Sequence, residues 1–416
     1  MSGVEGHAAP GWQAVADAFA ANFEEERELG AACCVYVEGR PVVDVWGGSA
    51  DGRTGRPWLE DTVVTAFSTT KGATAICAHM LVERGELDLD ARVADYWPEF
   101  ATAGKEDTRV RWLLSHRAGL PAIDATLTIE EVCAWEPAVR ALEAQTPFWP
   151  PGERHLYHAQ TYGFLVGEVV RRVTGKTLGR FFADEVAGPL GLAAWIGAPE
   201  EVEPRAAHLV IETPPADLQA AQRARLEEVG VAPEAIPAVL AMAGELAAEP
   251  LVARSVDLGG SLPDGLVTEN GAYNSRPLRA AELPGSSIVT DARSLARMYA
   301  ATVGEVDGVR LLEPATVEKM CVVQSDETSL YNPPPGFAEL AHWFETRFGS
   351  GVMRPTRFSP LLGPRSFGHG GAGGSLGCGE PDARVGFGYV MNRMNTNGTD
   401  VRAARLAAAV RDCLDG

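Results

Sequence analysis

The sequence predicts an α+β protein in which an antiparallel sheet is flanked by helices from the two ends of the chain. Alternating apolar residues predict strands near both termini, at residues 31–37, 41–47 and 384–391. Between these strands the apolar spacing is mostly helical. We therefore expect a sheet domain made of residues 1–67 and 285–416, a mainly helical domain inserted as residues 68–284, and a functional site where the two meet.

Each end of the chain adds a helix to the predicted sheet. Residues 11–29 carry an apolar stripe, and the acidic stretch at 24–28 is expected to be solvated. A hairpin then turns at residues 38–40. At the other end, Asp400 is a good N-cap residue for a last helix that runs through Leu414.

The middle of the chain predicts several helices separated by glycine and proline. The clearest helical segments are residues 69–84, 129–144, 162–174 and 218–229. Residues 218–252 are rich in alanine and glutamate, which indicates two exposed helices.

Composition excludes several classes of function. The chain has 416 residues, with 36 basic against 56 acidic side chains and a net charge of -20, so we expect neither a nucleic-acid partner nor an anionic membrane partner. No apolar run approaches the roughly 18 residues of a membrane span, and the N-terminus lacks the features of a secretory signal. Seven cysteines without a CxxC pair, and no HxH or HExxH spacing, predict no metal and no cofactor. We expect a cytoplasmic protein, and the sequence leaves its oligomeric state open.

The strongest chemical signal is the Ser-Thr-Thr-Lys segment at residues 68–71, which follows an apolar stretch and opens a predicted helix. A spacing of three residues puts the Ser68 hydroxyl and the Lys71 amine on one face of the first turn. A neutral lysine there can take the serine proton, and the helix N-terminus offers a backbone N–H to an oxyanion. The chain has only four lysines, so chance would produce about 0.15 such pairs. The alternative is a capping serine followed by an exposed lysine.

Two weaker segments can complete such a site. Tyr157 precedes the predicted helix at 162–174, and a nearby cationic Lys71 would favour its phenolate and let it relay a proton. By itself, a half-buried structural tyrosine is the simpler interpretation. Residues 367–375 are rich in glycine, which indicates that the backbone closely approaches something. That is either a ligand, with the Ala372 N–H completing an oxyanion site, or a turn between strands.

Together with residues 113–120 (LLSHRAGL), these segments occur in an order that resembles the serine β-lactamase and penicillin-binding protein superfamily. More narrowly, they look like its class C-like carboxylesterases, the family VIII esterases. The resemblance covers nearly the whole chain and implies a β-lactamase/transpeptidase-like fold. It implies that Ser68 is the acylated nucleophile, Lys71 its base and Tyr157 a second proton-transfer residue. The backbone N–H groups of Ser68 and Ala372 would form the oxyanion hole.

Two segments depart from the β-lactamase pattern. Where those enzymes carry Tyr-x-Asn, residues 157–159 are Tyr-His-Ala, so a substrate-orienting amide is absent. Where they carry Lys-Thr-Gly, residues 369–371 are His-Gly-Gly, so a mostly neutral imidazole replaces a fixed cation. Both changes are expected to weaken the binding of anionic lactams and D-alanyl peptides as substrates. We expect these segments to bind the substrate, through His158, Ala159, His369, Gly370 and Gly371.

The combined interpretation is a serine hydrolase that cleaves small-molecule carboxylic esters through an acyl-enzyme. Acyl transfer to an alcohol, β-lactamase or D-peptidase activity, and a non-catalytic scaffold remain as alternatives. Residues 373–377 also fit G-x-S-x-G, but no histidine follows Ser375, so we expect Ser375 to be structural or to line the pocket. The proline-rich residues 325–335 are expected near the pocket rim.

Overall fold

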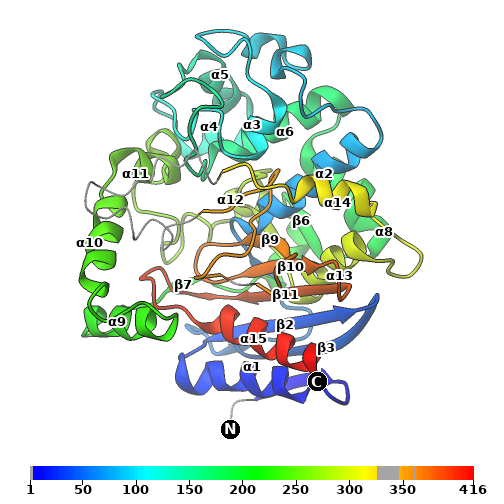
Figure 1. Ribbon diagram of the computed structural model, residues 1–416, viewed down its shortest axis with the longest axis vertical. Helices are drawn as coiled ribbons and strands as arrows, with labels where there is room; N and C mark the ends of the chain where they lie inside the picture. Colours follow the sequence, from blue (N-terminus) through cyan, green and yellow to red (C-terminus); the bar gives the residue numbers. More distant parts are fainter. Residues whose placement is uncertain (1–2, 326–345, 360) are drawn as a thin grey trace.

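The principal sheet joins strands from the two ends of the chain (Figure 1). The computed structural model describes residues 3–325, 346–359 and 361–416. The strand order is β1-β3-β2-β11-β10-β9, with β4 paired to β3, and the pairings are antiparallel. These strands are β1 Val4–Ala8, β2 Gly30–Val37, β3 Arg40–Asp51, β4 Arg56–Pro57, β9 Phe367–Gly370, β10 Leu376–Glu380 and β11 Val385–Met391.

Two smaller sheets connect this sheet to the middle of the chain. One has the order β5-β8-β6 and is antiparallel, and in the other β12 pairs with β7 in parallel. Their strands are β5 Val64–Thr65, β6 Ala194–Ile196, β7 Val210–Ile211, β8 Ile288–Thr290 and β12 Arg393–Met394. Because β5 directly precedes the Ser-Thr-Thr-Lys segment, its pairing with β8 anchors the approach to that segment.

The predicted hairpin is present as β2 and β3, which turn at Glu38 and Gly39. Both residues have positive φ angles, 48° and 79°, as a tight two-residue hairpin turn requires. Strand β11 pairs with β2 at the centre of the sheet, and all seven of its residues are buried. The strands predicted from the two ends of the chain are therefore neighbours in one sheet.

Helices cover both faces of this sheet. Helix α13 packs against β11, β10 and β2, while α1 and α15 lie together on the opposite face (Figure 1). Strand β11 carries glycines where α13 crosses it, and a Cβ atom on Gly388 would lie 2.2 Å from the carbonyl oxygen of Ala292. The sheet and α13 therefore approach to backbone contact.

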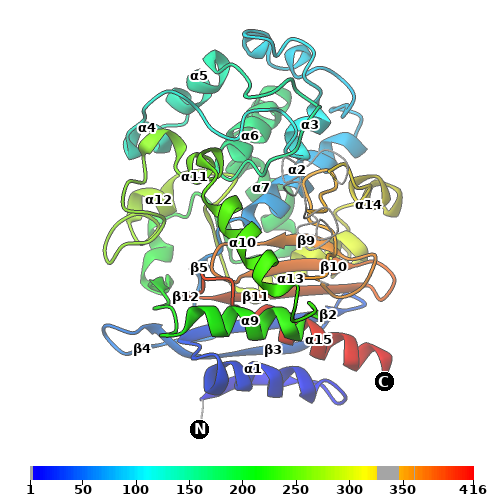
Figure 2. The same ribbon diagram turned by 60° about the vertical axis from the view of Figure 1, so that its left-hand side comes forward.

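The remaining helices lie mostly beyond the β9 side of the sheet, with α3 to α6 at the far end of the molecule (Figures 1 and 2). Helices α9 and α10 run along one side and lead to α11 (Figure 2). The helices are α1 Gln13–Glu25, α2 Thr69–Glu83, α3 Val110–Leu114, α4 Ile129–Cys133, α5 Glu136–Ala144, α6 Thr161–Thr174, α7 Leu178–Phe182, α8 Gly188–Leu190, α9 Leu218–Glu228, α10 Ile236–Ala247, α11 Pro250–Val256, α12 Arg276–Ala280, α13 Ala292–Val303, α14 Pro314–Met320 and α15 Arg402–Asp415.

The helices predicted at 69–84, 162–174 and 218–229 are confirmed as α2, α6 and α9, but the helix predicted at 129–144 is wrong. It is divided into α4 and α5 at Trp135, whose φ of 69° is incompatible with a continuous α-helix. Pro137 at the start of α5 has no N–H to continue the hydrogen bonds of α4.

Helix α1 is shorter than predicted, and α15 begins one residue later and runs one residue past Leu414. Helix α1 ends at Glu25, and Glu28, expected in a solvated stretch, is buried because Arg402 and Tyr389 supply partners for its carboxylate. Helix α15 begins at Arg402 with Val401 as N-cap, while the Asp400 side chain accepts from the Arg402 backbone and guanidinium instead of capping the helix.

Among the described residues, no single helix is long and apolar enough to cross a membrane. Helices Ile236–Ala247 and Pro250–Val256 meet that test only as a pair, and they are bent by 61° at their junction.

We predict that Gly388→Ala destabilises the fold by about 2–3 kcal/mol, because the added methyl group overlaps the backbone of α13. Gly244→Ala in α10 is the matched control, since in the described part of the chain no atom beyond its chain neighbours and its own helix backbone lies within 4 Å of a Cβ atom there. In a helix that change adds about 0.5–1 kcal/mol of stability. Urea unfolding of both variants measures the difference, and equal midpoints would contradict the close packing of β11 and α13.

Candidate active site

Ser68 lies at a sharp turn between β5 and α2. It is the N-cap residue of α2 and is partly exposed, whereas its neighbours on both sides are buried. The preceding Phe67 has a φ of 47°, which is rare for a bulky residue, and its buried ring packs on Tyr273 with centroids 5.0 Å apart. The anchored phenylalanine thus holds the turn that exposes the Ser68 hydroxyl.

Lys71 is fully buried one turn into α2 and faces Ser68. Its Nζ atom lies 3.1 Å from Ser68 Oγ and donates to the carbonyl oxygens of Ala159 and Gly285, each at 2.7 Å. Burial lowers the pKa of the Lys71 amine well below its ordinary value. The two carbonyls can only accept, so a neutral amine gives them its two N–H groups and keeps its lone pair for Ser68.

Tyr157 completes a compact group with these two residues. Its ring lies under the Lys71 amine, 4.9 Å from Nζ to the centroid, and its hydroxyl is hydrogen bonded to Ser68. Burial raises the pKa of Tyr157, and the hydrogen bond to Ser68 only partly offsets this. The expectation of a favoured phenolate is therefore wrong: a neutral Lys71 supplies no cation, and Tyr157 stays protonated.

The glycine-rich segment is the turn between β9 and β10, and it lies against the start of α2. A Cβ atom on Gly371 would be 2.1 Å from the carbonyl oxygen of Ala66. Ser375 Oγ donates to the same oxygen at 3.0 Å, which gives Ser375 the structural role expected for it. The sequence left a ligand contact or a simple turn open here, and the structure shows a turn packed on protein.

Two backbone N–H groups at this junction are unused. Within the described ranges, neither Ser68 nor Ala372 donates its N–H to a backbone or side-chain acceptor. The Gly371 carbonyl, in the same peptide group as the Ala372 N–H, accepts from Gly374 N at 3.2 Å inside the turn. In a trans peptide the N–H points the opposite way, so the Ala372 N–H is directed out of the turn.

His369 is a buried residue of β9 beside this group. Its Nδ1 atom bonds to the carbonyl oxygen of Gly370 at 2.7 Å, and its ring lies 6.0 Å from that of Tyr157. Burial, and secondarily the nearby Lys71, lower the pKa of His369 to about 3. The imidazole is therefore neutral near pH 7.

His158 and Ala159, which were expected to bind the substrate, make hydrogen bonds within the protein. His158 is fully buried, with Nε2 accepting from Leu120 N at 3.1 Å and Nδ1 bonded to the carbonyl oxygen of Leu156 at 2.6 Å. Because backbone groups use both ring nitrogens, His158 has a structural role and no free nitrogen for a substrate. Ala159 contributes its carbonyl oxygen, which holds Lys71.

Sequence reasoning missed three residues around the site. Gly285 supplies the second carbonyl that holds Lys71, and no sequence motif marks it. Phe348 and His116 pack on the Tyr157 ring, with centroids 5.8 Å and 4.7 Å away. His116 belongs to the 113–120 segment, which could have indicated it, whereas Phe348 has no recognisable signal. Of residues 325–335, all after Ser325 lie outside the described residues.

Comparison with known proteins places this geometry in a family. The beta-lactamase family model matches residues 15–412. The chain belongs to the beta-lactamase family. It is 34% identical over 401 residues to the esterase/beta-lactamase LipL of Mycobacterium tuberculosis, covering 94% of this chain and 83% of the relative.

Solved structures of beta-lactamase-like proteins have the same fold. A family VIII carboxylesterase is 33% identical with a TM-score of 0.80, and EstA from Arthrobacter nitroguajacolicus Rue61a is 31% identical with a TM-score of 0.78. Each alignment covers 99% of both chains. The predicted β-lactamase/transpeptidase-like fold is confirmed.

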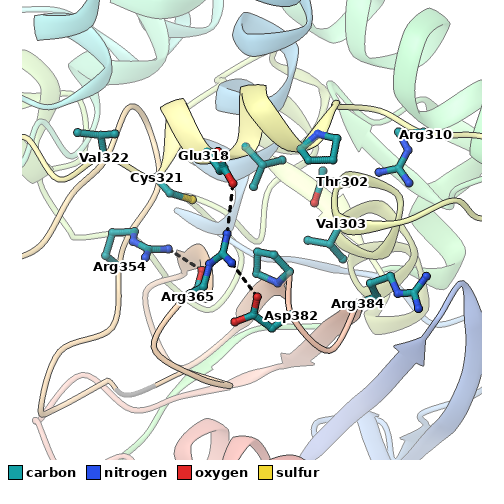
Figure 3. Close-up of a pocket in the computed structure, with 13 residues that line it drawn as sticks. Thr302, Val303, Arg310, Glu318, Cys321, Val322, Arg354, Arg365, Asp382 and Arg384 are labelled. Atoms are coloured by element: carbon teal, nitrogen blue, oxygen red, sulfur yellow. Dashed lines mark hydrogen bonds and ion pairs between the residues drawn. The ribbon is translucent and has the colours of Figure 1, made fainter.

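A separate cavity of about 560 Å³ lies between α14 and the turn that follows β10 (Figure 3). Its lining includes Arg365, which pairs with Glu318 at 3.6 Å and Asp382 at 2.8 Å. Arg384, also in the lining, pairs with Glu38 at 2.6 Å. Arg354 donates to the carbonyl oxygens of Arg365 and Ser366. Since three of the four lining arginines already have partners, we assign no ligand to this cavity. In the described part of the chain, no group of three or more His, Cys, Asp or Glu residues is arranged to hold a metal ion.

Buried histidines next to the site make stability depend on pH. Among the residues that the structure describes, neither ring nitrogen of His155 has a hydrogen-bond partner, and burial lowers the pKa of His155 to about 3. Unfolding restores a value of about 6.5, so the unfolded chain binds the extra proton. The contribution of neutral His155 is fully present above pH 6.5 and is lost as pH falls toward 3.

We predict that in His155→Phe the free energy of unfolding falls less steeply as the pH is lowered. Between pH 6 and 4 the slope should decrease by about 1.4 kcal/mol per pH unit. Phenylalanine retains the ring that packs on Phe348, with centroids 5.4 Å apart. Urea unfolding at a series of pH values measures the slope. His7→Phe, at an exposed position of β1, is the control; an equal change in both variants would contradict the role of buried His155.

Proposed function

We propose that this protein is a serine carboxylesterase that cleaves neutral small-molecule esters through an acyl-enzyme on Ser68. The observation that carries the proposal is the position of Lys71 Nζ, between two backbone carbonyls and 3.1 Å from Ser68 Oγ. A buried amine in that position is a ready proton acceptor for a serine nucleophile. The esterase and carboxylesterase names of the similar proteins support ester hydrolysis.

The proposed reaction begins when Ser68 Oγ bonds to the ester carbonyl carbon and its proton passes to neutral Lys71. The carbonyl oxygen becomes an oxyanion, which the N–H groups of Ser68 and Ala372 stabilise. As the C–O bond breaks, protonated Tyr157 donates its proton to the departing alkoxide and regains one from Lys71. Water then attacks the acyl-enzyme, with the same pair moving its protons, and releases the carboxylic acid.

A neutral ester suits the polar groups around the proposed nucleophile. His369, with its pKa lowered to about 3, offers no positive charge where a β-lactam carboxylate would need one. Ala159 has no side-chain amide to orient an amide substrate. Gly370 and Gly371 remain proposed substrate-binding residues through their backbone groups, since a Cβ atom on Gly370 would meet only the Ser375 carbonyl oxygen, at 3.7 Å, whereas Gly371 packs on Ala66.

The proposed site draws its residues from both parts of the predicted two-domain division. We propose that residues 1–67 with 285–416, and residues 68–284, form the two domains and that the site lies between them. Lys71 and Ala159 come from the inserted segment, whereas Gly285 and Gly371 come from the sheet segment. The cytoplasmic location and the absence of nucleic-acid and membrane partners stay predictions.

We predict that Ser68→Ala lowers hydrolysis of p-nitrophenyl butyrate at least about 10³-fold, because the nucleophile is lost. Mass spectrometry after a fluorophosphonate probe should show the label on Ser68. Ser375→Gly, which removes the other candidate hydroxyl, is the control and should keep the label. Rapid nitrocefin turnover without p-nitrophenyl butyrate hydrolysis would favour a β-lactamase instead.

We predict that kcat/KM rises with pH and reaches its plateau well below pH 10, because the base form of Lys71 is the active one and burial lowers its pKa. Lys71→Arg cannot lose its proton near neutral pH and should lower kcat about 10²- to 10⁴-fold. Lys105→Arg is the matched control: Lys105 is also buried and donates to the Glu143 and Gln145 carbonyl oxygens outside the site. Equal activity of the two variants would contradict the role of Lys71.

A further inference from the structure

Arg402 binds the turn between β9 and β10 from the side of α15. It lies in the first turn of α15 and is 1% exposed. Its guanidinium group makes five hydrogen bonds, its full donor capacity. Two go to the carbonyl oxygens of Gly373 and Arg393, each at 2.9 Å. The others go to the carboxylates of Glu28, at 2.8 Å, and Asp400, at 2.8 and 2.9 Å.

The two carboxylates are themselves held in place. Glu28, just before β2, also accepts from the hydroxyl of Tyr389 on β11. Asp400 accepts from the Arg402 backbone N–H at 3.0 Å. A buried guanidinium is stable only when its charge and its donors are satisfied. The network therefore fixes the position of Arg402 relative to the sheet.

The glycine turn lies directly on this network. A Cβ atom on Gly374 would lie 2.4 Å from Asp400 Oδ2 and 3.1 Å from Arg402 Nη2. Gly374 has a φ of 124°, which L side chains rarely adopt. The Gly373 carbonyl oxygen accepts from Asn395 N at 3.1 Å as well as from Arg402. At Gly373 and Gly374 the turn is therefore in direct contact with Arg402 and Asp400.

The start of α2 fastens the opposite side of the turn. Ser375 Oγ lies 3.2 Å from Thr69 Oγ1 and donates to the Ala66 carbonyl at 3.0 Å. Ala66 and Thr69 flank Ser68 within two residues. The turn is therefore clamped between the segment that carries Ser68 and the Arg402 network, and Ala372 lies in the middle of the clamped stretch.

We propose that Arg402 is a positioning residue that sets the place of the Ala372 N–H relative to the Ser68 N–H. This inference rests on the proposed function, in which both groups bind the oxyanion. Arg402 touches no substrate and acts through the Gly373 carbonyl. Donors of this kind stabilise a transition state only when they are aimed at the developing oxyanion, so a small shift lowers kcat more than it raises KM.

The test compares Arg402→Lys with Arg405→Lys. Lysine keeps the positive charge between Glu28 and Asp400 but has only three donors. Arg405 is the matched control because it bonds to Glu25, Glu26 and Asn22 from the same helix without touching the turn. Hydrolysis of p-nitrophenyl butyrate is measured per active site, counted by the end point of fluorophosphonate labelling, so that unfolded protein does not contribute.

For Arg402→Lys we expect kcat to fall about 10- to 100-fold with KM changed less than about threefold. Inhibition by an alkyl boronic acid should weaken by a similar factor, because its adduct with Ser68 places an oxygen where the oxyanion forms. A merely structural role would lower the number of titrated sites and leave these values unchanged. Arg405→Lys should remain within about twofold of the parent protein.

Asp400→Asn provides a second variant that keeps the size of the buried group. It removes one charged acceptor of the Arg402 guanidinium, and we expect a smaller fall in kcat, about threefold to tenfold, with the same boronic acid effect. Unchanged kcat per titrated site and unchanged boronic acid inhibition in the folded variants would overturn the inference. Full activity of Ser68→Ala would instead overturn the proposed function, so the two failures are distinguishable.

Discussion

Burial of the Lys71 amine is the constraint on which the rest of the site depends. Lys71 Nζ is held by two carbonyl oxygens and pairs with no carboxylate among the described residues, so burial favours the neutral amine. Burial also affects the protonation of the neighbouring Tyr157. Tyr157 keeps its proton because its own burial raises its pKa, and the Lys71 lone pair is available to Ser68. Burial thus favours the uncharged form of both Lys71 and Tyr157, the two proposed proton-transfer residues.

The two carbonyls come from distant parts of the chain. Ala159 precedes α6, and Gly285 precedes β8. Strand β8 pairs with β5, which leads to Ser68. The amine therefore joins three segments that are far apart in the sequence. The chemistry of this site is a product of long-range packing and not of the Ser-Thr-Thr-Lys segment alone.

This dependence explains which features could be predicted from the sequence. Strand alternation and the three-residue spacing of Ser68 and Lys71 are local patterns, so the sheet at both ends and the facing pair were predictable. Glu28 was expected in solvent because its partners, Arg402 and Tyr389, are hundreds of residues away. Pro137 is a sequence signal for the break between α4 and α5, whereas the positive φ of the aromatic Trp135 has none. His158 was assigned to the substrate because its backbone partners, Leu120 and Leu156, are invisible in the motif.

The uncharged imidazole of His369 also bears on how the reaction ends. Hydrolysis turns an ester into a carboxylate, and near pH 7 the neutral imidazole of His369 offers that anion no counterion. The chain as a whole carries a net charge of -20, which repels a newly formed acid. The same electrostatics that leave an incoming ester unaffected therefore promote departure of the product. Product inhibition by the released acid should consequently be weak.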